Sequence, residues 1–303
     1  MSSIPRVLLA IDRPGWAFDH IAQTLIRHLG HEFDFSVGIQ DRIVEGETDM
    51  VVVFWWGYAS LLRANLKVKR VLTCLYDGHS WTTEDGMRQF RLNYLQSDLL
   101  AVANEALARI IPWSIKPVTI IEDGVDTELF RPTGQWPEEF AVGWVGNSSH
   151  GASRSSSRGI KGLELIVEAC DRAGVRLITL DVAGRQGRAR KIAFEQMPDW
   201  YSKISAYVCA SSCEGTPNPV LEAMACGRPV ITTNVGLVRR VVINERNGYV
   251  VNRCVDSIVD ALTKLKDHHD LHHMGKLARL AAEAHDWRSK ISYWRTALWT
   301  ALS

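Results

Sequence analysis

Residues 214–232 decide the fold, and they read Glu-Gly-Thr-Pro-Asn-Pro-Val-Leu-Glu-Ala-Met-Ala-Cys-Gly-Arg-Pro-Val-Ile-Thr. Pro219 suits the first turn of a helix because it has no N–H to leave unpaired, and Asn218 before it suits the N-cap. The later Gly-Arg-Pro is a stop signal, because glycine ends helices and proline cannot continue one. Together these residues predict a helix over residues 219–226.

Two short apolar runs flank this helix, residues 206–210 before it and residues 229–233 after it, and both are typical of buried strands. The unit is therefore strand, loop, helix, strand. The helix N-terminus, from Asn218 through Pro219 to Val220, is expected to offer free N–H groups and a positive dipole end to an anion.

Two carboxylates belong to the same unit, Glu214 in the loop and Glu222 about one turn inside the helix. An ionised carboxylate only accepts hydrogen bonds, and sugars supply the donors. The pattern favours a ligand that carries both phosphate and hydroxyl groups. The alternative is an ordinary strand–helix–strand connection with solvated glutamates.

The whole run resembles the donor-site signature of the retaining family-4 glycosyltransferases of GT-B architecture, in which seven residues separate the two glutamates. This resemblance implies an α/β protein of two Rossmann-like domains with a donor and acceptor cleft between them. It also implies transfer of a hexosyl group from a nucleotide diphosphate to an acceptor hydroxyl, with retention of configuration and without a metal.

The composition is that of a globular chain and sets few other limits. Its 303 residues are enough for two domains, with 46% hydrophobic and 23% charged residues and a net charge of +1. The six cysteines form no Cys-x-x-Cys pair, which favours reduced thiols and a cytoplasmic location. The start of the sequence has no signal-peptide pattern, and no apolar run reaches the ~18 residues of a membrane span, so we expect at most peripheral membrane contact.

The first half predicts a parallel sheet, because its apolar runs are short and separated by helical or polar segments. A helix is predicted over residues 17–29, where apolar residues recur with helical spacing. Between the first strand and this helix, Gly15 lets a ligand approach the backbone, and the resemblance makes it a donor-site residue. The predicted strands are residues 6–11, 34–38, 50–56, 70–76, 99–103 and 118–121.

The fourth of these strands ends at Asp77-Gly-His-Ser-Trp81. Open α/β sheets bind ligands at the carboxyl ends of their strands. The resemblance places His79 against the donor sugar in a catalytic role. Asp77, Trp81 and Trp16 are expected to contact the acceptor, although ordinary packing is the alternative for the aromatic residues.

Residues 122–132 mark the domain boundary. They read Glu-Asp-Gly-Val-Asp-Thr-Glu-Leu-Phe-Arg-Pro and resemble the family's interdomain signature Asn-Gly-Val-Asp-x-x-x-Phe-x-Pro, with Asp123 in the place of the asparagine. The resulting domains are an acceptor-binding domain (1–132), a linker (133–139), a nucleotide-sugar domain (140–285) and a C-terminal helix that packs back on the first domain (286–303).

The second domain opens with a strand over residues 140–146 and a helix over residues 160–173. By the resemblance, Lys161 addresses the donor diphosphate, whereas Asn147 stands where an arginine is expected. The candidate substitutes are Arg154, Arg158 and Arg185, because a guanidinium reaches a diphosphate from several loop positions. Arg185, which follows the strand over residues 176–183, is the preferred candidate.

The resemblance completes the site with Glu214 orienting the donor sugar and Glu222 accepting from the ribose hydroxyls. Lys161 and Glu214 are the catalytic candidates in this domain. No metal ion or cofactor is expected besides the nucleotide sugar as co-substrate. A cluster of four histidines is interpreted as a solvated helix connection: His268, His269, His272 and His273.

Several functions remain open at this stage. A glycan or glycolipid is the first expectation for the acceptor, and a hydroxylated nucleic-acid base is the second. A nucleotide-sugar epimerase and a non-catalytic nucleotide-sugar binder are the alternatives to a transferase.

Overall fold

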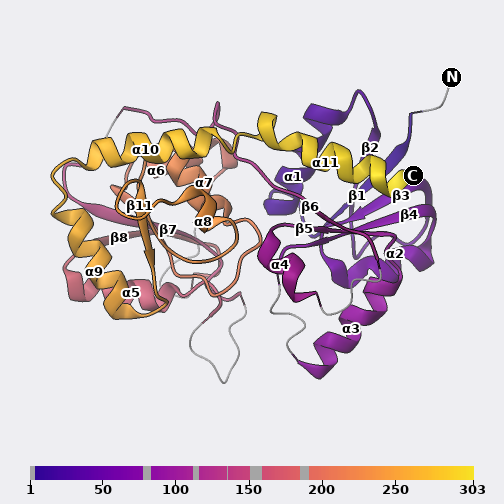
Figure 1. Ribbon diagram of the computed structural model, residues 1–303, viewed down its shortest axis with the longest axis horizontal. Coiled ribbons are helices and arrows are strands. Elements are labelled where there is room, and N and C mark those ends of the chain that lie inside the picture. Colours follow the sequence, from indigo (N-terminus) through magenta and orange to yellow (C-terminus); the bar gives the residue numbers. More distant parts are fainter. Residues whose placement is uncertain (1–3, 78–82, 112–115, 135, 151–158, 185–190) are drawn as a thin grey trace. The chain divides into compact units, whose positions relative to one another are not determined.

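The computed structural model describes residues 4–77, 83–111, 116–134, 136–150, 159–184 and 191–303 (Figure 1). The chain divides into two compact units. The first combines Met1–Asp123 with Trp287–Ser303, and the second is Gly124–Asp286. The stretch predicted as a linker, residues 133–139, lies inside the second unit, and the C-terminal helix belongs to the first.

The first unit contains a parallel six-stranded sheet in the order β2-β1-β3-β4-β5-β6. Its strands are rich in Val, Leu and Ile because a parallel sheet covered by helices is buried on both faces. The strands are β1 (Arg6–Ile11), β2 (Asp34–Ile39), β3 (Gly46–Val53), β4 (Leu66–Leu75), β5 (Leu99–Val102) and β6 (Val118–Ile120). The helices are α1 (Ala17–Leu29), η1 (Trp56–Tyr58), α2 (Ala59–Asn65), α3 (Glu84–Leu95), α4 (Glu105–Ile110) and α11 (Trp287–Leu302).

Helix α11 completes the first unit from the far end of the sequence (Figure 1). Trp294 is fully buried in the core with residues of β1 and β3. Its indole Nε1 donates to Asp123 Oδ1 at 3.2 Å, and the Tyr76 hydroxyl donates to the same oxygen at 3.2 Å. An acceptor is needed at this position, and the carboxylate of Asp123 supplies it where the family usually has asparagine.

The second unit contains a parallel five-stranded sheet in the order β11-β10-β9-β7-β8. The strands are β7 (Ala141–Gly146), β8 (Arg176–Asp181), β9 (Ala206–Cys209), β10 (Val230–Thr233) and β11 (Gly248–Val251). The helices are α5 (Leu163–Ala173), η2 (Phe194–Gln196), α6 (Met197–Tyr201), α7 (Asn218–Ala225), α8 (Val238–Val241), α9 (Val255–Lys266) and α10 (Leu271–Glu283).

Several predicted boundaries were wrong by a few residues. Helix α5 begins at Leu163 because Gly162 before it is in the left-handed region at φ +62°. Helix α7 begins at Asn218, so the N-cap position belongs to Pro217, and no side chain caps the helix. Strand β3 starts and ends earlier than predicted, since Trp56 already belongs to η1.

Within the described residues, no helix combines the length and the hydropathy of a membrane-spanning segment.

Candidate active site

The sheet order of the second unit sets the position of the site. Strands β8 and β9 lie on opposite sides of β7, so the connections after β7 and β9 leave in opposite directions. A crevice opens at the carboxyl ends of strands where the order reverses, and ligands of open α/β sheets bind there. The predicted Lys161 follows β7, and the predicted Glu214 follows β9.

Lys161 and Glu214 meet at this place. The Lys161 Nζ lies 2.6 Å from Glu214 Oε1, and the Ser211 hydroxyl donates to the same oxygen at 2.7 Å. The two side chains are 28% and 15% exposed, which leaves each within reach of a ligand. No described residue donates to the second oxygen of Glu214, so it is available to a hydroxyl group.

Gly162 makes this meeting geometrically possible. A Cβ on Gly162 would lie 2.4 Å from the Ala210 carbonyl oxygen, so only glycine lets the turn before α5 pack against the end of β9. Arg253 holds the same two segments together, because its guanidinium donates to the Ala210 and Gly159 carbonyls at 2.9 and 2.7 Å. No sequence pattern singled out this arginine.

The ion pair keeps the lysine charged. Burial disfavours the ammonium, but the Glu214 carboxylate outweighs burial and raises the pKa of Lys161 above its ordinary value. An ammonium held at a strand end is a point charge that suits a phosphate oxygen.

Glu222 points into a different environment. It is half-buried, its Oε2 accepts a hydrogen bond from the Tyr201 hydroxyl at 2.7 Å, and burial raises the pKa of its carboxyl to about 7. Glu214 and Glu222 thus differ in partner, one being bound to a cation and the other to a neutral hydroxyl.

The first turn of α7 differs from the prediction. The Asn218 N–H donates to the Thr216 carbonyl at 2.8 Å, and the Val220 N–H donates to the Pro217 carbonyl at 2.9 Å. Pro219 has no N–H. The expected free donors are therefore absent at these three positions, because the two prolines fold the chain into tight turns that use the donors internally.

Asn147, which stands where an arginine was expected, has a local role. Its side-chain oxygen accepts from the Ser149 N–H at 3.0 Å. The adjacent Ser148 donates to Asp181 through its hydroxyl at 2.6 Å and through its N–H at 3.1 Å. These bonds join the end of β7 to the end of β8.

In the first unit, the predicted Gly15 and Trp16 follow β1. Gly15 has φ +69°, which a glycine adopts without strain, and its N–H donates to Asp19 Oδ2 at 2.7 Å. The Arg13 guanidinium lies 4.4 Å from the centre of the Trp16 ring. Asp12, which the sequence analysis did not single out, has one buried carboxylate oxygen without a partner, and burial raises its pKa.

Asp77, the other described acceptor candidate, is half-buried just beyond β4. His79, Trp81, Arg154, Arg158 and Arg185 lie outside the described residues.

The four histidines predicted as a helix connection lie between α9 and the first turn of α10. Among the residues that the structure describes, no group of three or more His, Cys, Asp or Glu side chains is arranged to hold a metal ion.

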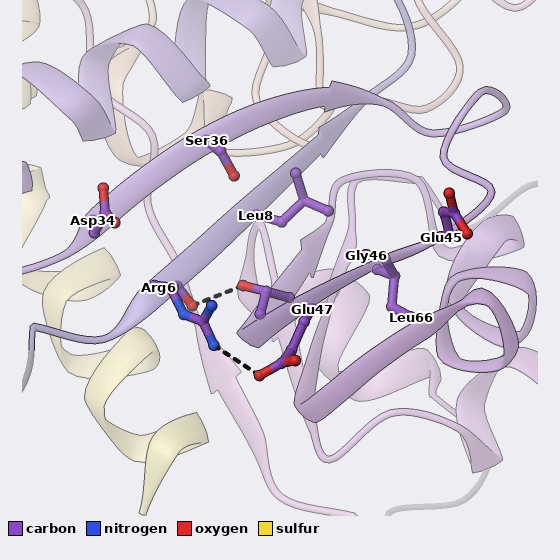
Figure 2. A pocket seen from close by; sticks show the side chains of 9 residues that line it. Arg6, Leu8, Asp34, Ser36, Glu45, Gly46, Glu47 and Leu66 are labelled. Atoms are coloured by element: carbon purple, nitrogen blue, oxygen red, sulfur yellow. Dashed lines mark hydrogen bonds and ion pairs between the residues drawn. The ribbon is translucent and has the colours of Figure 1, made fainter.

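A pocket of about 240 Å³ in the first unit lies away from the strand ends that bind ligands (Figure 2). Arg6, Asp34, Glu47 and Leu66 in its wall come from the amino-terminal ends of β1 to β4. Figure 2 shows the Arg6 side chain directed at Glu47, 3.3 Å away. Because the pocket lies at the opposite ends of the strands, we assign it no role in the site.

Comparison with known proteins agrees with this geometry. Residues 154–268 match the family model described as glycosyl transferases group 1. The matched stretch includes Lys161, Glu214 and Glu222. A D-inositol 3-phosphate glycosyltransferase of Kribbella flavida is 27% identical over 216 residues, which cover 59% of this chain. They cover 51% of that relative, so the chain spans about half its length.

Two solved structures share the fold over nearly the whole chain. Sucrose-phosphate synthase of Thermosynechococcus elongatus matches at 15% identity with a TM-score of 0.75, covering 99% of this chain and 100% of that one. HepE of Anabaena, in complex with UDP and glucose, matches at 12% identity and the same TM-score, covering 98% and 100%. The predicted GT-B fold of two parallel-sheet α/β domains is confirmed. The comparisons support the glycosyltransferase prediction and give no support to a nucleic-acid acceptor, an epimerase or a non-catalytic binder.

Proposed function

We propose that the protein transfers a hexosyl group from a nucleoside diphosphate sugar to an acceptor hydroxyl, with retention of configuration and without a metal ion. The observation that carries this proposal is the Lys161–Glu214 pair at the switch point of the second sheet, with Glu222 on the next helix. Lys161 supplies a cation for the diphosphate. Glu214 supplies a carboxylate for the hexose hydroxyls, and Glu222 supplies one for the ribose hydroxyls.

In the proposed reaction, the bond between the anomeric carbon and the phosphate oxygen breaks. A bond between the acceptor oxygen and the same carbon forms on the same face, and the acceptor proton passes to the leaving phosphate. Negative charge develops on the diphosphate, and Lys161 stabilises it. Glu214 holds the sugar hydroxyls with its second oxygen, and Glu222 accepts from the ribose hydroxyls.

The donor and the acceptor follow from the same site and the relatives. HepE holds UDP and glucose, which makes UDP-glucose the first donor to test. The name of the Kribbella relative points to a polyol phosphate as an acceptor, beside the glycans and glycolipids already expected. Trp16, Asp77 and Trp81 are the acceptor-binding residues of the proposal, and Gly15, His79 and Arg185 are assigned to the donor.

The first experiment measures the melting temperature with UDP-, GDP-, ADP- and CMP-sugars and with the free nucleotides. A ligand that binds only the folded state raises it. The best donor is then incubated with acceptors in EDTA, and the anomeric configuration of the product is read by NMR. Retention of configuration in EDTA supports the proposal, whereas inversion or loss of turnover contradicts its mechanism.

Two variants separate the proposed roles. Lys161→Met should weaken binding of the nucleoside diphosphate by about tenfold or more, since a charge-assisted bond is lost, and should leave the nucleoside unaffected. Glu214→Gln should lower turnover but keep the affinity for the free nucleotide. The matched control is Lys203→Met, which changes an exposed lysine of the same unit. An equal loss of nucleoside diphosphate affinity in the two lysine variants would show that Lys161 does not bind the diphosphate.

A further inference from the structure

Tyr201 is the described residue whose side chain donates to Glu222. It ends α6, and its hydroxyl lies 2.7 Å from Glu222 Oε2 and 3.4 Å from the Pro219 carbonyl oxygen. Within the described residues, nothing donates to Oε1 of Glu222. The bond therefore occupies one carboxylate oxygen and leaves the other for a ligand.

The Tyr201 ring is fixed by its neighbours. It is fully buried and meets Trp200, Phe130 and Tyr207 edge to face, with ring centres 5.0, 6.1 and 6.2 Å apart. Such aromatic pairs prefer this geometry. Arg228 Nε also donates to the Tyr201 carbonyl at 3.0 Å, so both the backbone and the side chain are held. A hydroxyl held in this way fixes the direction of its acceptor.

We propose that Tyr201 is a positioning residue for the nucleoside subsite, holding the Glu222 carboxyl so that its second oxygen faces the ribose hydroxyls. This inference rests on the proposed function. It extends the role of the 122–132 signature, because Phe130 of that signature packs against the ring that orients Glu222.

The same contact gives the subsite a pH dependence. Within the described part of the chain, the titratable groups that interact with Glu222 are Tyr201 on α6, Tyr207 on β9 and Cys226 after α7, and burial raises the pKa of each far above neutrality. Glu222 is thus the member of this set whose charge changes near pH 7. Burial raises its pKa, and the bond from Tyr201 opposes that increase by favouring the carboxylate.

The test compares Tyr201→Phe with the wild type. Phenylalanine keeps the ring and removes only the hydroxyl. The matched control is Tyr207→Phe, which removes a buried hydroxyl of the same cluster that donates to the Val145 carbonyl at 3.3 Å. Calorimetry measures binding of UDP, GDP and ADP, and of the 2′,3′-dideoxy form of the best binder, from pH 6 to pH 8.5.

We expect the wild type to prefer the ribonucleotide, increasingly so as the pH rises and Glu222 loses its proton. Tyr201→Phe should lose roughly fivefold of this preference, as expected for one hydrogen bond, and its pH midpoint should move upward. Tyr207→Phe should keep both properties. Unchanged preference and midpoint in Tyr201→Phe would overturn this inference alone, whereas a wild type that binds none of the nucleotides would overturn the proposed function with it.

Discussion

Replacing Glu222 by glutamine should make the second unit more stable above neutral pH. Glutamine keeps the size of the side chain and an oxygen that accepts the Tyr201 hydroxyl, but it removes the charge. Because burial raises the pKa of Glu222 from 4.5 to about 7, the folded protein must hold a carboxylate that is better solvated in the unfolded chain. The substitution removes this penalty.

The size of the effect follows from linkage. Ionisation of Glu222 lowers the free energy of unfolding. This loss is near zero below pH 4.5, grows between pH 4.5 and about pH 7, and is constant above that. The full difference corresponds to about 3 kcal/mol at 1.36 kcal/mol for each pH step, and we expect about 2 kcal/mol because the half-buried side chain is partly screened by solvent. Near pH 5 the difference should fall below about 1 kcal/mol.

Differential scanning calorimetry from pH 5 to pH 8.5 checks this prediction. At pH 8 we expect Glu222→Gln to melt about 4–8 °C above the wild type, with a smaller difference at pH 5. The control is Glu168→Gln, which changes an exposed glutamate on α5 and should give no pH-dependent difference. A gain that is equal at both pH values, or a loss at pH 8, would refute the linkage argument. The same variant should bind ribonucleotides more weakly, since the amide replaces the carboxylate.

Two further substitutions test contacts that build the units. Gly162→Ala should disrupt the Lys161–Glu214 pair and abolish nucleotide binding, because its Cβ would collide with the Ala210 carbonyl. The control is Gly174→Ala: Gly174 has a similar φ angle but open space around it, so the substitution should lower the free energy of unfolding in urea by only about 1 kcal/mol. Lys290→Met should destabilise the first unit by about 3–5 kcal/mol, because the Glu122 carboxylate, only 4% exposed, would lose the Lys290 ammonium that lies 2.7 Å away. Urea midpoints measure that loss, and replacing Glu122 by leucine as well should recover most of it.

The strands of the two sheets were predictable because their signals are local. Short apolar runs define the strands, and the Glu-Gly to Pro-Val-Ile run defines the loop and helix between two of them. The contribution of Gly162 was also encoded locally, as a glycine next to the lysine. What brought the lysine to the glutamate was the strand order, which a parallel α/β topology largely determines.

The missed residues act across the sequence. Tyr201 and Glu222 are 21 residues apart, and Arg253 and Ala210 are 43 apart, so no short pattern joins them. The polar stretch 133–139 favoured a domain boundary, but Trp136 in it lies over the Arg228 guanidinium at 4.2 Å. Polarity predicts a loop and does not say whether one of its side chains packs.

The return of α11 to the first unit has a consequence for the order in which the chain folds. The second unit is continuous in sequence, so all of its strands are available once residue 286 has been synthesised. The first unit lacks the buried Trp294, and Glu122 lacks the Lys290 ammonium, until α11 has been synthesised. We expect the second unit to be completed first during translation. A protease that removes α11 would then take core residues from the first unit and leave the second unit folded.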